Sequence, residues 1–152
     1  MSNEVKKSSV AHPPLRRVVT GLDADGRSCI LTDDAARMLI WQVSDLPADN
    51  SSNAEQGDSQ FSFPEKGARF IFSDLPPGVV SPMHATDTID FVVVLSGSIT
   101  FVTETGETLL RAGDVLVDRG IVHAWRNDGE EVCRLVTVLC PAHPLGKGAM
   151  GL

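Results

Sequence analysis

Two stretches of the sequence carry side chains that can do chemistry. Residues 83–97 read MHATDTIDFVVVLSG and residues 113–127 read GDVLVDRGIVHAWRN, so each holds one histidine among other polar residues. Imidazole groups bind divalent metals or transfer protons near neutral pH. Residues two apart in an extended strand share a face, so His84 and Thr86 point to the same side. The question is whether the two histidines build one site or lie at two ordinary strand ends.

Short strand-like segments must position these residues, because they fill most of the chain. The apolar runs recur at roughly ten-residue spacing and are separated by turn residues, which predicts an antiparallel sandwich or small barrel. The runs are RRVVTGL and RSCIL around an Asp-Ala-Asp-Gly turn, RMLIWQV, ARFIFSDL, FVVVLSG, SITFV and TLLRAGDVLV around a Glu-Thr-Gly-Glu turn, and EEVCRLVTVLC. TDDAARML, residues 32–39, has the composition of a helical turn but lacks a sustained 3.6-residue period.

We expect one domain, because 152 residues are enough for a single core. Residues 14–67 supply N-terminal strands, 68–140 form the core, and 141–152 form a tail rich in Pro and Gly. Residues 44–60 are acidic and poor in apolar side chains, so they predict a mobile loop. This loop is either a lid or a passive insertion.

The composition argues against several function classes. The 13 basic and 20 acidic residues give a net charge of −7, whereas nucleic-acid binding requires a basic face. The apolar runs are far shorter than the roughly 20 residues of a membrane span, and the polar first residues do not resemble a signal peptide. Three widely spaced cysteines do not suggest a disulfide framework. We therefore expect a cytoplasmic protein without nucleic-acid or membrane partners.

The two stretches resemble the paired signature motifs of the cupin family. The motif residues are Gly78, His84, Thr86, Asp90 and Gly97, followed by Gly113, Gly120, His123 and Asn127. The resemblance covers about residues 68–139. It implies an all-β double-stranded β-helix, or jelly-roll, barrel of two antiparallel sheets. It further implies that His84, Asp90 and His123 face the interior, where two imidazoles and a carboxylate can hold a divalent ion such as Fe, Mn, Zn or Ni.

The sequence departs from the usual cupin ligand set at two positions. The family's second histidine is Thr86 here, and its glutamate is Asp90. Threonine is a poor ligand for first-row divalent ions. Aspartate is shorter than glutamate by one methylene, roughly 1.5 Å. Metal binding and a metal-free site therefore both stay open.

The same residues also make sense without a metal. Asp90 can orient the imidazole of His84 or His123 and leave a base poised near neutral pH. Trp125 lies two residues after His123, so it shares that strand face and lines the pocket beside Thr86. Trp41, Phe70 and Phe72 are further candidates for the pocket wall. The structural alternative is that the histidines are hydrogen-bonded core residues and the aromatic side chains only fill the core.

Three functions fit this pattern, all with a small organic molecule in the barrel pocket. The first is a metal-dependent dioxygenase, decarboxylase or isomerase. The second is a metal-free lyase, isomerase or cyclase that uses His/Asp acid–base chemistry, and the third is a ligand-binding or sensing module without catalysis. We also expect a homodimer, because the strand-like segment LRRVVTGL leaves an open edge and open edges pair with partners.

Overall fold

The protein is all-β over the residues that the computed structural model describes, 12–151. Within this range, no helix is long and apolar enough to cross a membrane. The strands are β1 (Arg16–Leu22), β2 (Ser28–Ala35), β3 (Leu39–Val43), β4 (Ala68–Leu75), β5 (Thr88–Ser96), β6 (Ser98–Thr103), β7 (Glu107–Arg111), β8 (Val115–Asp118), β9 (His123–Arg126) and β10 (Cys133–Pro141).

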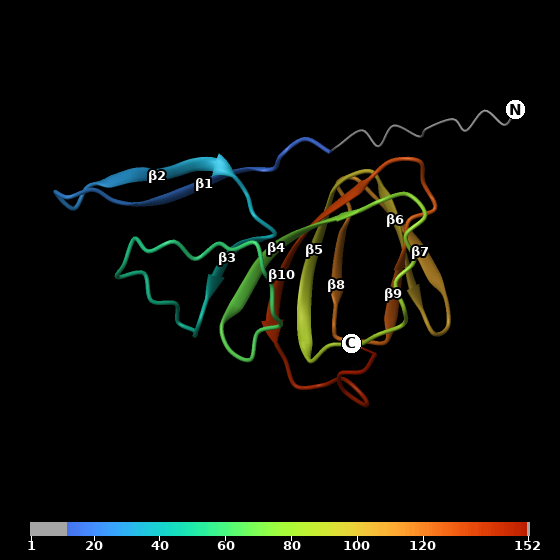
Figure 1. The fold of residues 1–152 in the computed structure, drawn as a ribbon. Coiled ribbons are helices and arrows are strands. Elements are labelled where there is room, and N and C mark those ends of the chain that lie inside the picture. Colours follow the sequence, from blue (N-terminus) through green and yellow to red (C-terminus); the bar gives the residue numbers. More distant parts are fainter. Residues whose placement is uncertain (1–11, 152) are drawn as a thin grey trace, which may run out of the picture.

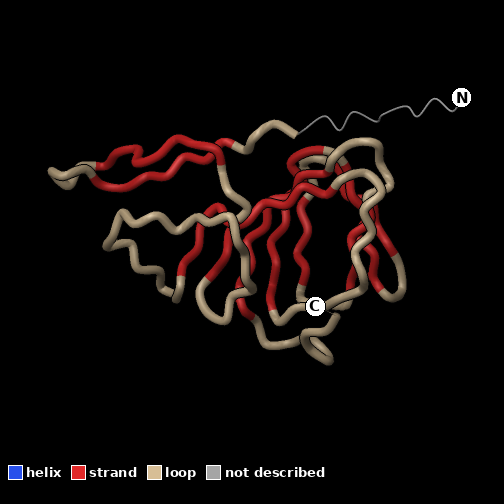
Figure 2. Tube along the Cα trace, viewed as in Figure 1, coloured by secondary structure: helices blue, strands red, loops and turns tan. Residues whose placement is uncertain are grey.

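Two antiparallel sheets face each other and form the barrel. The larger sheet has the order β3-β4-β10-β5-β8, and the smaller has the order β7-β6-β9. Figure 1 shows the two sheets enclosing a common interior, and Figure 2 shows that strands and loops alone make up the described chain. The predicted all-β jelly-roll barrel is therefore confirmed. Residues 32–39 have the composition of a helical turn but do not form one, because residues 32–35 pair with β1 as part of β2.

Strand alternation sends one set of side chains into the barrel. On β5, Val92 and Val94 are buried while Phe91, Val93 and Leu95 are exposed. The same alternation on β10 buries Cys133 and Leu135 in a cluster shared with the smaller sheet, and buries Leu139 against Leu39 and Ile71 of its own sheet. Period-two alternation is what a half-buried strand requires. It also fixes the direction of Asp90, which lies two residues before Val92 and thus faces inward.

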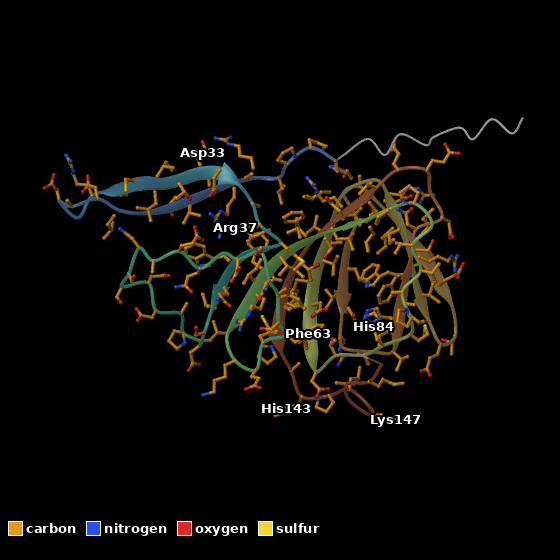
Figure 3. All side chains as sticks on the ribbon, in the orientation of Figure 1. Asp33, Arg37, Phe63, His84, His143 and Lys147 are labelled. Atoms are coloured by element: carbon orange, nitrogen blue, oxygen red, sulfur yellow. The ribbon has the colours of Figure 1, made fainter. Side chains whose placement is uncertain are left out.

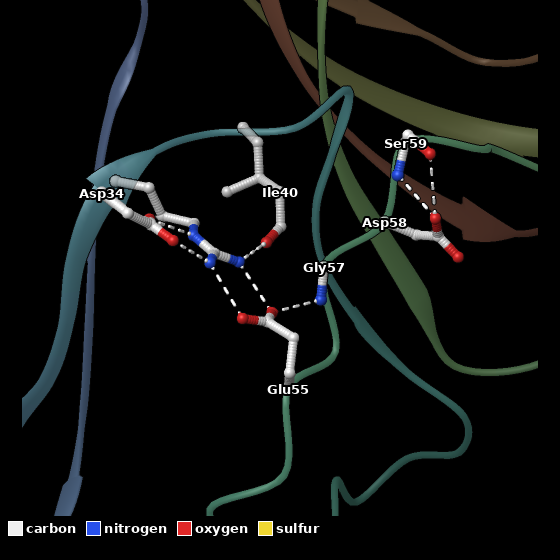
Figure 4. Close-up of polar contacts among 7 residues, drawn as sticks. Asp34, Ile40, Glu55, Gly57, Asp58 and Ser59 are labelled. Atoms are coloured by element: carbon white, nitrogen blue, oxygen red, sulfur yellow. Dashed lines mark hydrogen bonds and ion pairs between the residues drawn. The ribbon is translucent and has the colours of Figure 1, made fainter.

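The β1–β2 hairpin projects away from the barrel and is tied to it through Arg17 (Figure 1). The Arg17 guanidinium is buried, and it donates to Asp34 on β2, to the backbone carbonyl of Ile40, and to both oxygens of Glu55 at 2.7 and 2.9 Å. Figure 4 shows this cluster between the hairpin and the segment that follows β3. The contact with Glu55 therefore attaches the segment between β3 and β4 to the hairpin.

The segment between β3 and β4 contains the predicted mobile loop, residues 44–60. It has no named strand, but Asp58 forms an isolated backbone bridge with Leu39. The Asn53 amide donates to the Leu22 carbonyl at 2.7 Å. These contacts attach the second half of the loop to the neighbouring strands. The mobility of residues 44–60 stays a prediction.

The C-terminal tail folds back beneath the barrel (Figure 1). Met150 exchanges two backbone hydrogen bonds with Ala85, and the Ala149 N–H donates to the Asp87 carboxylate at 2.8 Å. A Cβ on Gly151 would lie only 3.2 Å from the Cα of His84. The tail thus passes directly beside the first of the two motif histidines.

Candidate functional site

A backbone bridge brings the two motif histidines together. The His84 N–H donates to the His123 carbonyl at 2.9 Å, and the His123 N–H donates to the His84 carbonyl at 2.8 Å. Residues that pair in this way point their side chains to the same face. The two imidazole centroids accordingly lie 4.4 Å apart. Segments forty residues apart in sequence therefore build one site.

The site lies in a cavity of about 160 Å³ inside the barrel. All five residues singled out from the sequence line it: His84, Thr86, Asp90, His123 and Trp125. Its apolar wall comes mainly from the larger sheet and from the segment that precedes β4. This wall includes Phe61, Phe63, Ile71, Val92, Leu135 and Leu139. Figure 3 shows the labelled side chains of Phe63 and His84 at the same half of the barrel.

Both imidazoles present the same nitrogen to the cavity. His84 Nδ1 lies 2.9 Å from the Pro82 carbonyl oxygen, and His123 Nδ1 lies 2.9 Å from that of Ile121. A carbonyl oxygen only accepts, so each Nδ1 must carry the hydrogen. In the neutral ring, Nε2 then keeps its lone pair. Each histidine can therefore accept a proton from the cavity side.

A buried carboxylate, Asp118, lies against His123. Its Oδ2 is 3.2 Å from His123 Nδ1, and the Asp118 side chain is 1% exposed. Its Oδ1 accepts hydrogen bonds from the N–H groups of Gly120 and Ile121. Gly120 has φ +73°, and a Cβ there would lie 2.5 Å from the Thr86 carbonyl oxygen, so the turn requires glycine. This turn fixes the distance between Asp118 and His123.

Burial and the Asp118 charge act on the pKa of His123 in opposite directions. Burial lowers the pKa most strongly, whereas the Ile121 carbonyl and Asp118 both raise it; the net shift is downward. His123 is therefore neutral near pH 7 and available as a base.

The pKa of Asp90 is shifted upward, in contrast to that of His123. Burial is the main cause that raises its pKa, to about 6, with a further contribution from the nearby charge of Asp118. The Thr88 hydroxyl donates to Asp90 Oδ1 at 2.7 Å and opposes the shift. Since that hydrogen is used, the 2.8 Å contact between Thr86 and Thr88 makes Thr86 the donor. Asp90 is thus a carboxyl group that can hold a proton near neutral pH.

The residues present do not fit the divalent ion that the resemblance implies. Catalytic metal sites use three protein ligands. Among residues 12–151, no group of three or more His, Cys, Asp or Glu side chains has an arrangement that could hold a metal ion. The hydroxyl hydrogen of Thr86 is directed to Thr88, and the Asp90 carboxyl is desolvated. The two Nε2 atoms are the best donors that remain.

Sequence reasoning missed two parts of the site and misplaced a third. Asp118 was missed, although an acidic residue within the apolar run VLVD is a signal that could have identified it. Phe61 and Phe63 also line the cavity, and their rings contact edge to face at 5.1 Å. Trp41, Phe70 and Phe72 do not line it. Phe70 is on the outer face of β4, because it alternates with the inward-facing Ile71.

The expected contact between Asp90 and an imidazole also needs correction. Asp90 bonds to Thr88, and the carboxylate that lies next to a ring nitrogen is Asp118. The reason is the strand pairing: Asp90 on β5 sits opposite Asp118 on β8, and Asp118 is five residues from His123 through the Gly120 turn. Both carboxyl groups face the interior, but they take different partners.

The chain is similar to known proteins of one family. A family model described as "Cupin domain" matches residues 71–139. The cupin-domain-containing oxidoreductase srdD of Neurospora crassa is 30% identical over 136 residues, covering 76% of this chain and 69% of that protein. The cupin-domain-containing oxidoreductase fogC of Aspergillus ruber is 30% identical over 147 residues, covering 82% and 72%.

A solved structure is also similar to the barrel. It is a Cupin 2 conserved barrel domain protein from Salinispora arenicola, with a TM-score of 0.46 and 22% identity, covering 49% of this chain and 64% of that one. The family match and the two relatives, which align over most of the chain, agree with the motifs and the barrel described above. The chain belongs to the cupin family.

Proposed function

We propose that this cupin catalyses proton transfer on a small organic molecule in its barrel cavity, with His123 as the base and Asp90 as the acid. The observation that carries the proposal is the buried Asp118 carboxylate 3.2 Å from His123 Nδ1. It places a negative charge where the imidazolium will form, while the Ile121 carbonyl holds the Nδ1 hydrogen and leaves Nε2 free to take a proton. A histidine base beside a buried carboxylate that stabilises its imidazolium is a common arrangement for proton abstraction.

The reaction that fits these groups is the removal of a hydrogen next to a carbonyl. His123 Nε2 takes the proton as the C–H bond breaks, and the Asp90 carboxyl donates its proton to the carbonyl oxygen, which gives an enol. Asp90 then takes back the proton from the enol oxygen while His123 delivers its proton to a different carbon of a conjugated enol, which isomerises the molecule. His84, 4.4 Å from His123 between ring centroids, is placed to relay a proton or to hydrogen-bond the same oxygen. Electrons and protons balance without a further reactant.

Deuterium exchange tests this function without knowledge of the natural substrate. 2-Cyclohexen-1-one in D₂O serves as the probe, and proton NMR follows the loss of its α-hydrogens. We expect exchange above the buffer rate with the native protein and a fall of about 100-fold in the His123→Gln variant, the usual size of a general-base contribution. Equal exchange by the native protein and the variant would overturn the proposal.

A second candidate follows from the relatives, whose printed names call them oxidoreductases. In that case His123 would remove the proton from a hydroxyl group while an electron acceptor oxidises the carbon. The discriminating observation is whether conversion requires an added electron acceptor, such as a nicotinamide nucleotide. Ligand binding with neither exchange nor oxidation would instead favour a non-catalytic binding module.

A further inference from the structure

The walls of the cavity restrict the charge and size of its ligand. We propose that the natural ligand is an uncharged molecule about the size of one six-membered ring, with an oxygen atom directed at His84 and His123. This inference rests on the proposed function, because it concerns the same cavity.

Charge is the first restriction. Within the described residues, neither lysine nor arginine lines the cavity. Arg17 and Arg134 are buried, but they are paired with carboxylates outside it, Arg17 with Asp34 and Glu55 and Arg134 with Asp74. An anionic ligand would find no cationic side chain at the wall and would meet the Asp118 carboxylate behind His123. Burying an unpaired charge carries a large desolvation penalty, so the cavity disfavours carboxylate and phosphate groups.

The apolar wall also disfavours cations. Phe61, Phe63, Val92, Leu135 and Leu139 surround the space in front of the two histidines. An ammonium group would lose its water there, and the Asp90 carboxyl could offer it only Oδ2, because Thr88 already donates to Oδ1 at 2.7 Å. A neutral ligand pays no such desolvation penalty.

Size is the second restriction. An apolar cavity of about 150 Å³ accommodates benzene, and the cavity here measures about 160 Å³. A single ring with one small substituent therefore fills it. Two fused rings exceed this volume, so the second ring would lie partly outside the pocket and lose apolar contact with its wall.

The polar groups set the orientation of the ring. His84 and His123 lie side by side at one part of the wall, with Asp90 and Thr86 on the chain that continues from His84. Most of the remaining lining is apolar, with Ser73 and Thr137 as the other hydroxyl side chains. A ligand oxygen is therefore hydrogen-bonded at the histidine end while the ring packs against the phenylalanine and leucine side chains.

The test compares probes that share one skeleton and differ only in charge or size. Cyclohexanone, cyclohexanecarboxylate, cyclohexylammonium and 2-decalone are titrated into the native protein at pH 7. Two-dimensional NMR follows the two tryptophan indole N–H signals. Trp125 lines the cavity and Trp41 does not, so Trp41 is an internal control, assigned through the Trp41→Phe variant.

We expect cyclohexanone to shift the Trp125 signal, leave Trp41 unchanged, and bind at least tenfold more tightly than each charged probe and than 2-decalone. Tighter binding of the carboxylate or the ammonium would overturn the charge argument, and tighter binding of 2-decalone would overturn the size argument. Binding does not depend on turnover. If cyclohexanone binds but no deuterium exchange occurs, the proposed function fails while the ligand class stands.

Discussion

At the scale of single residues, Asp118 sets how well His123 works as a base. Proton transfer creates a buried imidazolium, and the Asp118 carboxylate at 3.2 Å stabilises it. Asp118→Asn preserves the shape but removes the charge. We expect the exchange rate to fall about 100-fold, with little change in KM. Asp118 raises the pKa of His123, so this pKa should be lower in the variant than in the native protein. The acidic limb of the pH–rate profile, where His123 becomes protonated, should therefore move to lower pH.

The matched control is Glu130→Gln, which removes one negative charge at an exposed position outside the cavity. It should leave both the rate and the pH profile unchanged. A purely structural role for Asp118 would predict lower stability with an unshifted pH profile. That result would contradict the assignment.

The two departures from the family motif lead to a prediction on metal binding. We expect the native protein to hold less than one equivalent of iron(II), manganese(II) or zinc(II) in a calorimetric titration. Thr86→His combined with Asp90→Glu presents three imidazoles and a longer carboxylate, and should bring binding close to one equivalent. Thr105→His, in the exposed turn after β6, is the control. Nanomolar binding of one equivalent by the native protein would refute the conclusion that the residues of the site do not fit a divalent ion.

The sequence indicated which motif residues line the cavity, but it did not indicate which other side chains they contact. His84, Thr86, Asp90 and His123 were found because motif spacing and strand alternation determine the direction of a side chain. Asp118 was missed because its role depends on the pairing between β5 and β8, a contact between segments distant in sequence. Register of that kind follows from the folded barrel, and the local pattern does not contain it.

At the scale of elements, Glu55 attaches the segment between β3 and β4 to the hairpin. Its hydrogen bond with Arg17 is the largest cause that lowers its pKa, to about 2 from 4.5. Because the folded pKa lies below the unfolded one, this contribution is complete above about pH 4.5 and is lost as the pH falls towards 2. Glu55→Gln should therefore lower the free energy of unfolding at pH 7 by up to about 1 kcal/mol, a modest value because Glu55 is half exposed.

Chemical denaturation at pH 7 and pH 2.5 measures this effect, and the difference between native protein and variant should shrink at the lower pH. Glu65→Gln, at an exposed position of the same segment, is the control. Faster amide exchange over residues 44–60 in the Glu55→Gln variant should accompany the loss. An equal difference at both pH values would show that the Arg17 contact is not the cause.

The strands were more predictable than the segments between them. Short apolar runs bounded by turn residues located β4, β5 and β10, and each of these strands has one face in the core. The composition of residues 44–60 indicated a loop but did not reveal that Arg17 would hold it. The aromatic residues just after this loop were not recognised as part of the cavity, because no local pattern in the sequence relates them to it.

At the scale of the whole molecule, the outer face of the larger sheet is apolar and exposed. Phe91 pairs with Val117 and Val93 pairs with Val115 across β5 and β8, and all four side chains point outward. Val115 is 72% exposed. A contiguous exposed apolar patch of this kind marks an interaction surface. The β1–β2 hairpin carries further exposed apolar side chains, Val18, Leu22 and Ile30.

We expect this face to join two copies of the chain in a homodimer, because a second copy offers the same apolar patch and a two-fold axis pairs identical surfaces. Sedimentation at tens of micromolar should give twice the 16.3 kDa mass of one chain. Val117→Lys places a charge at the centre of the patch and should yield monomers, whereas Thr108→Lys, on an exposed position of the smaller sheet, should leave the dimer intact. A native protein that sediments as a clean monomer would show that this apolar face does not join two copies of the chain.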